Sequence, residues 1–357
     1  MLQNFTNLEV VSLSSVNISS SIPMNLSSSL RYVDLEATNF QGVRTERLFL
    51  LPNFKKLILD YNNLIKGVLP KIHPSSTLLE LSIAGTDISG ELPYSIGTLI
   101  SLSHLNLHGC DFSGPIPDSI GNLTQIRELE LADNHFTGHI PSTISNLKKL
   151  TRLDLSSNFF GGEIPNVLSN LPRDSNFNDS IPYFLGSMVK LFVLDLRRNN
   201  FTRSLPPLWG RSISMVTIIL NGNRFEGSVH VSLLNSDGLE VLDVENNAIN
   251  DMFPTCLGTL RELQISPELP HKKDSAGIDK PSLSGKVKPF SKNLLVRRIP
   301  QGLQFNTFEN DSYGRNFDLC GPPLSKQCGT SDSSHVPRPL DSEEEGESYF
   351  FSGFTWE

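Results

Sequence analysis

A repeat of about 24 residues constrains the fold of this chain more than any other feature of its sequence. Proline closes successive copies at Pro70, Pro93, Pro117, Pro141 and Pro165, so each step is close to one period. Pro206 and Pro254 follow and are separated by two periods. A short fixed period is typical of similar coils stacked on one another, so ordinary counting of globular domains does not apply.

Each copy fits the template LxxLxLxxNxFxGxIP, as residues 102–117 and 150–165 illustrate. The LxL part alternates apolar and polar residues, the period of a strand with one buried face, so we expect Leu105 and Leu107 to point inward. One coil cannot bury its apolar edge alone, and stacking at about 4.8 Å predicts a parallel sheet of about ten strands. Segments such as 118–123 are predicted to be short helical turns. Three leucines of these connecting segments are expected to be buried: Leu123, Leu147 and Leu260.

Asparagine recurs at the ninth template position, where the chain must turn. It stands at Asn134, Asn158, Asn199, Asn223 and Asn247. A buried amide at this position can satisfy backbone groups of neighbouring coils, so the repeats predict a ladder of stacked asparagines. The ladder is expected to be interrupted where Val16, Thr86 and Cys110 occupy the same position.

Charge and cysteine content exclude some classes of protein. The formal net charge is -8 and no basic cluster stands out, which argues against a nucleic-acid partner. Four cysteines are too few for a disulfide scaffold, but Cys320 and Cys328 are close enough in sequence to form one bridge. Cys110 and Cys256 each stand within a repeat and are expected to be small buried side chains with free thiols.

The ends of the repeats carry a first resemblance. Residues 113–117 read SGPIP and residues 137–141 read TGHIP. These endings resemble the plant-specific class of leucine-rich repeats. The resemblance implies an α/β solenoid: a right-handed superhelix with a parallel sheet on the concave face, an extra strand in each coil, and short helical or irregular segments on the convex face.

A second resemblance lies near the C-terminus, in residues 298–302, 304–308 and 319–324 together with Cys328. These segments resemble the cap of plant receptor-like proteins, in which an acidic spacer, one membrane helix and a short tail without a kinase follow. Residues 341–347 resemble that spacer, and residues 351–357 resemble the approach to the membrane helix. No long apolar stretch that could span a membrane and no export signal occur, so a place on the extracellular face of the plasma membrane rests on the resemblance.

Departures from the pattern define the expected domain boundaries. Pro165 and Pro182 stand closer together than one period, the template is missing in 264–298, and Arg315 stands where the family has glycine before the asparagine. We expect a truncated or rearranged member, or an imperfect gene model. The predicted divisions are repeats at 1–170, a degenerate short repeat at 171–182, repeats at 183–263, an irregular non-repeat segment at 264–298, a cap at 299–329 and a disordered acidic tail at 330–357.

Strand residues that point away from the core are the candidate ligand contacts, because they build the exposed face of the predicted sheet. They are Glu80, Ser82, His104, Asn106, His108, Glu128, Glu130, Arg152, Asp154, Asp195, Arg197, Asn221, Asp243 and Glu245. The alternative for each one is a solvated strand residue, since aspartate in LDL is common in such repeats.

Other site motifs are sparse. His104 with His108, and His135 with His139, form close pairs without a third ligand at fixed spacing, so no metal is predicted, and no cofactor either. The sequence has no GxSxG, GxxxxGK[ST] or HExxH motif, which argues against an enzyme. Glycosylation sequons begin at Asn4, Asn17, Asn25, Asn122, Asn178, Asn200 and Asn310, and Asn122 on a convex segment is the favoured acceptor.

The resemblance implies a plasma-membrane receptor that binds an extracellular peptide, protein or glycan ligand. Signalling in defence or development would then require a membrane co-receptor or adaptor kinase, because the chain has no kinase of its own. Two alternatives stay open. One is a soluble inhibitor of a secreted cell-wall-degrading enzyme, and the other is a non-functional truncated remnant.

Overall fold

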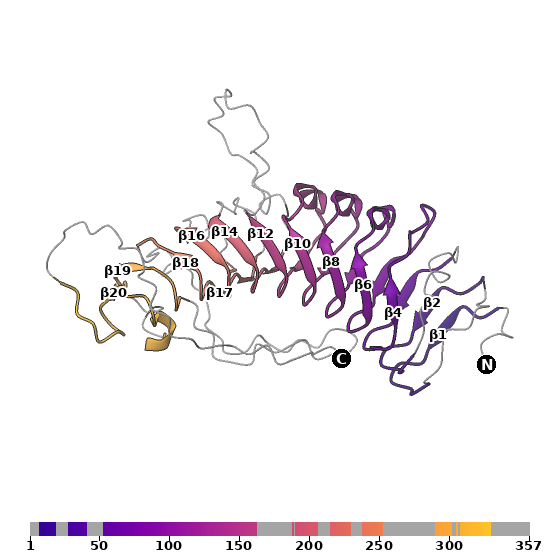
Figure 1. Cartoon of the computed structure of the whole chain (residues 1–357), viewed down its shortest axis with the longest axis horizontal. Coiled ribbons are helices and arrows are strands. Elements are labelled where there is room, and N and C mark those ends of the chain that lie inside the picture. Colours follow the sequence, from indigo (N-terminus) through magenta and orange to yellow (C-terminus); the bar gives the residue numbers. More distant parts are fainter. Residues whose placement is uncertain are drawn as a thin grey trace, which may run out of the picture.

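A computed structural model describes residues 7–18, 28–40, 53–162, 188, 190–205, 215–229, 238–252, 290–301, 305 and 308–329. Figure 1 shows an elongated stack of coils, in which each coil lies against the next along the long axis of the molecule. Nearly every described element is a short parallel strand or a short 3-10 helix. The predicted solenoid is therefore confirmed.

Ten successive coils each contribute one strand to a ten-stranded sheet, called here the main sheet. Its strands, in spatial order, are β1 (Val10–Ser12), β2 (Tyr32–Asp34), β3 (Lys56–Ile58), β5 (Glu80–Ser82), β7 (His104–Asn106), β9 (Glu128–Glu130), β11 (Arg152–Asp154), β13 (Val193–Asp195), β15 (Thr217–Ile219) and β17 (Val241–Asp243). All neighbouring pairs are parallel. The number of strands matches the expectation from the repeats.

The core behind the main sheet is a continuous column of leucines. Leu105 pairs in register with Leu129, and Leu129 pairs with Leu153, on adjacent strands. All three side chains are buried, as is Leu107. The alternation in the LxL motif therefore predicted correctly which side chains face inward.

A second sheet of eight parallel strands follows the turn in the eight coils from β3 to β17, and its members are the extra strands that the SGxIP endings implied. Its strands are β4 (Lys66–Val68), β6 (Asp87–Glu91), β8 (Asp111–Pro115), β10 (His135–Gly138), β12 (Phe159–Gly162), β14 (Asn200–Ser204), β16 (Arg224–Gly227) and β18 (Ala248–Ile249). The motif favours glycine because the backbone there is left-handed, with φ +73° at Gly114 and +75° at Gly138, although Arg203 and Arg297 adopt the same conformation at this position of other coils.

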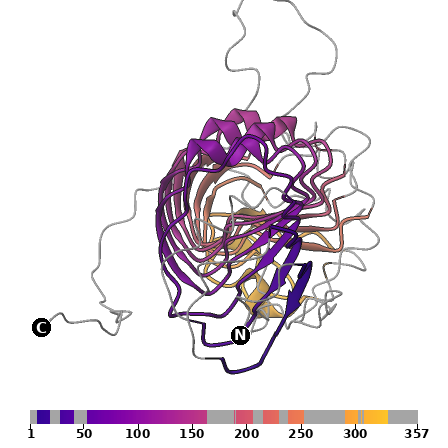
Figure 2. The same cartoon turned by 90° about the vertical axis from the view of Figure 1, so that its right-hand side faces the viewer.

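Short 3-10 helices close three of the described coils: η3 (Tyr94–Thr98), η4 (Asp118–Asn122) and η5 (Ser142–Asn146). Figure 2 shows them gathered on one side of the stack. Adjacent helices approach so closely that a β-carbon on Gly121 would lie 2.5 Å from the Thr143 carbonyl oxygen. Leu123 and Leu147 are buried beneath them, as predicted, whereas Leu260 lies outside the described residues.

The predicted asparagine ladder links coil to coil. Asn134 Oδ1 accepts a hydrogen bond from the Phe112 amide at 2.9 Å, and its Nδ2 donates to the Leu107 carbonyl at 2.7 Å, both in the preceding coil. Asn158, Asn199, Asn223 and Asn247 repeat this pattern. Beside the ladder, five phenylalanines stack with ring centroids 5.9 to 6.4 Å apart: Phe112, Phe136, Phe160, Phe201 and Phe225.

The ladder is interrupted at Thr86 and Cys110, as expected, where a hydroxyl and a thiol bond chiefly the Ile83 carbonyl and each other. The ladder also has members beyond the predicted asparagines. Asn62 extends it toward the N-terminus, and Asn293 and Asn316 extend it toward the C-terminus.

The expectation that 264–298 is an irregular non-repeat segment is wrong for the end of that segment. Residues 290–298 form a coil in which Phe290 takes a leucine position and Asn293 takes the ladder position, bonding Ile249 and Val244 of the coil before it. A short stretch, β19 (Val296–Arg298), pairs with β20 (Asp318–Cys320). Residues 264–289 lie outside the described residues.

The predicted cap is itself a coil of the solenoid. It contains η11 (Asn310–Tyr313) and β20, and Asn316 bonds back to Phe290 and Leu295. Arg315, placed where the family has glycine, adopts the left-handed conformation (φ 59°) that Asp133 and Ser157 adopt at the same position of other coils. The turn is therefore kept without the glycine.

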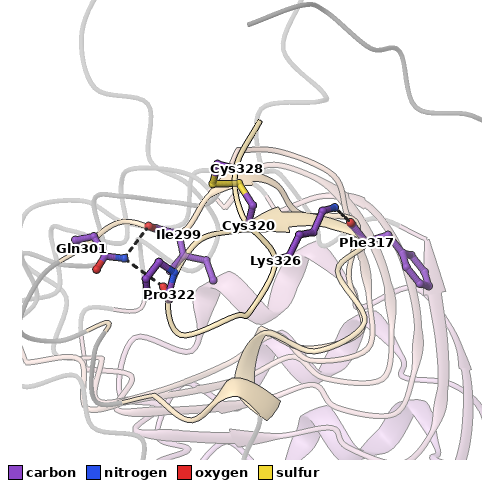
Figure 3. Close-up of a disulfide and its surroundings, with 7 residues drawn as sticks. All are labelled: Ile299, Gln301, Phe317, Cys320, Pro322, Lys326 and Cys328. Carbon is purple, nitrogen blue, oxygen red and sulfur yellow. Dashed lines mark hydrogen bonds between the residues drawn. A yellow bond between two sulfur atoms is a disulfide. The ribbon is translucent and has the colours of Figure 1, made fainter. Parts of the chain in front are cut away.

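A disulfide joins Cys320 to Cys328 at the end of this coil (Figure 3). Around it, the Gln301 side chain donates to the carbonyl oxygens of Ile299 and Pro322, and Lys326 donates to the Phe317 carbonyl. The predicted tail at 330–357 lies outside the described residues, as does Cys256. Within the described ranges, no helix is long and apolar enough to cross a membrane.

The two blocks of repeats stack as one solenoid. Strand β11 pairs directly with β13, and β12 pairs with β14. The predicted short repeat at 171–182 lies outside the described residues. The main sheet therefore continues from the first block to the second without an intervening strand between β11 and β13.

Candidate ligand-binding surface

The outward side chains of the main sheet form three parallel columns, because the strands pair in register. Glu80, His104, Glu128 and Arg152 follow one another in the first column, at the first residue of each strand. The third residue of each strand forms the second column. The residue two positions after that one forms the third column. All fourteen predicted contact residues fall in these columns, which together are called the sheet face.

The first column is partly exposed and carries polar pairs. Lys56 Nζ forms an ion pair with Glu80 Oε2 at 2.9 Å, and the exposed side chains of His104 and Glu128 approach to 3.9 Å. These groups lie at the surface, where water and a ligand can compete for their contacts.

The second column is largely buried, so solvated side chains are the wrong description of Ser82, Asp154, Asp195 and Asp243. Asp195 Oδ1 accepts the Arg197 amide at 3.1 Å, and Asp243 Oδ1 accepts the Glu245 amide at 3.0 Å. Asp154 bonds Ser156 in the same way. These carboxylates hold the turn that follows each strand, and coils on both sides cover them.

Burial changes the protonation of this column. The pKa of Asp195 is raised to about 7, first by burial and then by the neighbouring carboxylate of Asp154. Burial also raises the pKa of Asp243 to about 6. It does the same in the third column for Asp60, two positions after β3, whose pKa is raised to about 6. The Ser82 hydroxyl lies 2.7 Å from both carboxylate oxygens of Asp60, which opposes the shift there.

A cluster of charges crosses the middle of the sheet face. Arg152 Nε lies 2.8 Å from Glu130 Oε1, although the carboxylate is not aligned to accept a hydrogen bond from Nε. Its Nη2 lies 3.4 Å from Asp154 Oδ2. Burial alone would lower the pKa of Arg152, but the surrounding carboxylates, Glu130 first, outweigh it and raise the pKa. Arg197 and Asp195 add a further pair at 3.3 Å.

At the C-terminal end, Asn221 donates to Asp243 Oδ2 at 2.6 Å, and Glu245 accepts from the Ser291 hydroxyl at 2.8 Å. Lys292 Nζ lies 3.3 Å from Glu245 Oε1. Ser291 and Lys292 were not predicted as contacts, because they stand in a segment that lacks the full repeat template. Lys56 was not predicted either, although it stands one period before Glu80 and could have been found from that spacing.

The two histidine pairs noted in the sequence divide between the two sheets. His104 and His108 lie on the sheet face, where His108 Nδ1 is 3.5 Å from Asp133 Oδ2. His135 and His139 lie at the second sheet, where the His135 ring stacks on Phe159. Among the described residues, no group of three or more His, Cys, Asp or Glu side chains could hold a metal ion.

The described sequons lie off the sheet face. Asn122 is exposed on η4, Asn200 is exposed on β14 of the second sheet, and Asn17 and Asn310 are exposed near the two ends of the stack. The other three, Asn4, Asn25 and Asn178, lie outside the described residues. Cys110 is buried and its thiol is free.

Comparison with known proteins gives the repeats a family. The Leucine Rich Repeat family matches residues 101–123, 125–147, 149–171 and 190–212. Receptor-like protein 6 of Arabidopsis thaliana is 40% identical over 102 residues, which are 28% of this chain and 10% of that protein. Receptor-like protein Cf-9 of Solanum pimpinellifolium is 38% identical over 104 residues, which are 29% of this chain and 12% of that protein. The matched region thus spans about a tenth of these relatives.

Among solved structures, the plant peptide hormone receptor RGFR1, in complex with RGF2, is 28% identical to this chain. The superposition has a TM-score of 0.69 and covers 90% of this chain and 44% of the receptor chain. The strands, ladder and sheet face described above are thus those of a leucine-rich-repeat solenoid, similar to the solenoid of this plant receptor.

Proposed function

We propose that this chain, a leucine-rich-repeat protein related to plant receptor-like proteins, binds an extracellular peptide on its sheet face as part of a cell-surface receptor. The proposal places the chain on the outer side of the plasma membrane. Signalling would pass to a membrane co-receptor or adaptor kinase.

The observation that carries the proposal is a fixed polar surface backed by a buried leucine column. Every strand of the main sheet is bonded on both sides except at its two edges, so the side chains of the sheet face stand at set spacings. A surface ordered before binding loses little conformational freedom when a ligand is bound. Ten of the predicted contacts are accessible enough to meet a ligand directly: Glu80, His104, Asn106, His108, Glu128, Glu130, Arg152, Arg197, Asn221 and Glu245.

The four buried members have a different role in the proposal. Asp154, Asp195 and Asp243 fix the turns beneath the surface and set the charge that a ligand meets, without touching it. Ser82 instead bonds the Asp60 carboxylate. The class of ligand is inferred from RGFR1, whose solved complex contains RGF2 and which is a peptide hormone receptor.

The test is recovery of a ligand from the natural source. The full chain, immobilised, is incubated with the peptide fraction of plant extracellular fluid, and retained peptides are identified by mass spectrometry. The same column, loaded with a detergent extract of plant plasma membrane, tests for a retained kinase. We expect a peptide that binds one to one in solution.

A matched pair of charge reversals locates the binding surface. Glu128→Lys changes an accessible residue of the sheet face, and Glu226→Lys makes the same change at an exposed residue of β16 in the second sheet. We expect Glu128→Lys to weaken binding of the recovered peptide roughly tenfold or more, and Glu226→Lys to leave it within about twofold. Equal effects of the two reversals would contradict the proposal. Recovery of a secreted hydrolase instead of a peptide would favour the inhibitor alternative.

A further inference from the structure

An aromatic ring is left uncovered on the outer side of the second sheet. Phe159 opens β12 and is 54% exposed, unlike Phe160 beside it, which is buried in the core stack. On one side its ring meets His135 of the preceding coil, with ring centroids 5.8 Å apart. On its other side lies β14 of the following coil, the neighbouring arrow in Figure 1.

The strand on that open side begins with a sequon. Asn200, Phe201 and Thr202 read N-x-T, and Asn200 is exposed while Phe201 is buried. Phe159 and Gly161 point to the same side of β12, because they are two positions apart on a strand. A β-carbon on Gly161 would lie 3.8 Å from the Asn200 β-carbon. The Asn200 side chain therefore projects from the sheet next to Gly161, which has no side chain. The Phe159 ring lies two positions before Gly161 on β12.

We infer that Asn200 carries an N-linked glycan whose first N-acetylglucosamine packs on the exposed ring of Phe159. A pyranose ring presents a face of C–H bonds, and such a face packs favourably on the electron-rich face of an aromatic ring. The absent side chain at Gly161 leaves the space through which the sugar reaches the ring. The glycan would thus cover apolar surface that the fold leaves open to water.

The modification is a group transfer from a lipid-linked sugar diphosphate. A bond forms between C1 of the sugar and Nδ2 of Asn200, and the bond between C1 and the diphosphate oxygen breaks. The amide loses one proton to solvent and the lipid diphosphate leaves with the bonding electrons. This requires passage through the secretory route, so the inference rests on the cell-surface location in the proposed function.

The position of the glycan has a consequence for recognition. Asn200 lies on the second sheet, on the far side of the turn from β13, whose outward residues belong to the sheet face. A glycan there would leave the sheet face free for a ligand. It would restrict access to β12, β14 and β16 instead.

The test uses the full chain, secreted from insect cells behind an added export signal. Glycopeptide mass spectrometry measures occupancy at Asn200 and, as an internal reference, at the exposed Asn122 on η4. Trimming to a single N-acetylglucosamine with an endoglycosidase then leaves the sugar that is inferred to touch Phe159. The unfolding temperature is measured for the trimmed chain, Asn200→Gln, Phe159→Ser and the double variant.

We expect Asn200 to be occupied and its loss to lower the unfolding temperature by roughly 1 to 3 °C in the parent chain. In the Phe159→Ser background the same loss should change the temperature by less than about 0.5 °C. Thr202→Ala, which abolishes the sequon but keeps Asn200, should match Asn200→Gln.

Two results would overturn the inference. One is an exported chain that is glycosylated at Asn122 and empty at Asn200. The other is a glycan at Asn200 whose removal lowers the unfolding temperature by the same amount in chains with and without Phe159. A chain that carries no glycan at any sequon would also overturn it. Because the added export signal imposes the secretory route, none of these results tests the cell-surface location, which the ligand recovery described above tests separately.

Discussion

The coils on either side of β11 are joined in two different ways, and yet they pack alike. From Leu129 to Leu153 the chain advances by one period, whereas from Leu153 to Leu194 it advances by much more than one period. Asn158 bonds Phe136 and Leu131 of the coil before it at 2.9 Å each. Asn199 bonds Phe160 and Leu155 at 3.0 and 2.9 Å. The register therefore follows from the fit of buried side chains and the ladder amide, not from the length of chain between coils.

Removing a ring from the stack at this junction should have the largest effect. Phe160 is buried between Phe136 and Phe201. It therefore contacts both the coil one period before it and the coil beyond the long connection. Phe160→Ala should lower the free energy of unfolding by about 3 to 5 kcal/mol, because the cavity opens at the place where two blocks meet. Urea unfolding followed by far-UV circular dichroism measures this. Phe225→Ala, near the end of the stack, is the matched comparison, and a smaller loss at Phe160 than at Phe225 would contradict the account.

The ladder amides give a sharper comparison of the two junctions. Asn199→Ala and Asn158→Ala each leave a buried amide of the preceding coil and several carbonyls without a partner. Each change should cost roughly 2 to 4 kcal/mol. Equal costs would mean that the ladder acts alike across both connections. If Asn199→Ala cost under about 1 kcal/mol while Asn158→Ala cost its full amount, the junction would be only loosely packed.

Protonation distinguishes the junction in a third way, because Asp195 faces Asp154 across it. The folded-state pKa of Asp195, about 7, is above the ordinary value of about 3.9 in an unfolded chain. The folded chain then binds the proton more tightly. The stability linked to this group is complete below about pH 4, and is lost as the pH rises through about 7.

Asp195→Asn should therefore flatten the fall in stability between about pH 4 and pH 7 and raise stability at pH 8 relative to the parent chain. Urea midpoints at pH 5, 6, 7 and 8 provide the measurement. Glu226→Gln, at an exposed residue of β16, is the control and should leave the pH profile of the parent unchanged. A parent chain whose stability rises from pH 5 to pH 8 in step with the Asp195 variant would exclude this linkage.

The smallest effect is expected where the ladder is already interrupted. The Cys110 thiol makes fewer hydrogen bonds than an asparagine at the ladder position makes. Its main partner is the Ile83 carbonyl oxygen, at 3.1 Å. Cys110→Asn should restore a ladder member and raise the free energy of unfolding by about 1 kcal/mol, whereas Cys110→Ala should lower it by a similar amount. Thermal melts of both variants suffice. A loss of stability in both would show that the coil cannot accommodate an amide there.

The sequence predicted the parts of this molecule that depend on repetition. The strand positions, the inward leucines, the ladder asparagines and the three columns follow from the period and from alternation along a strand. Burial of Asp154, Asp195 and Asp243 did not follow, because alternation gives the side on which a side chain lies and not how far neighbouring coils cover it. The coil at 290–298 was missed because only half of the template is present, with Phe290 in place of a leucine. The choice of ligand contacts within the sheet face stays a prediction.

Hydrogen exchange at the two junctions tests the central claim most directly. The Leu131 amide bonds the Asp154 carbonyl at 2.9 Å within the uninterrupted stack, and the Leu155 amide bonds the Asp195 carbonyl at 2.9 Å across the long connection. If one buried column of side chains holds all coils together, both amides should be protected to a similar degree, within about tenfold of each other. A Leu155 amide that exchanges at the rate of an open chain, while Leu131 stays protected, would mean that the two blocks are separate solenoids.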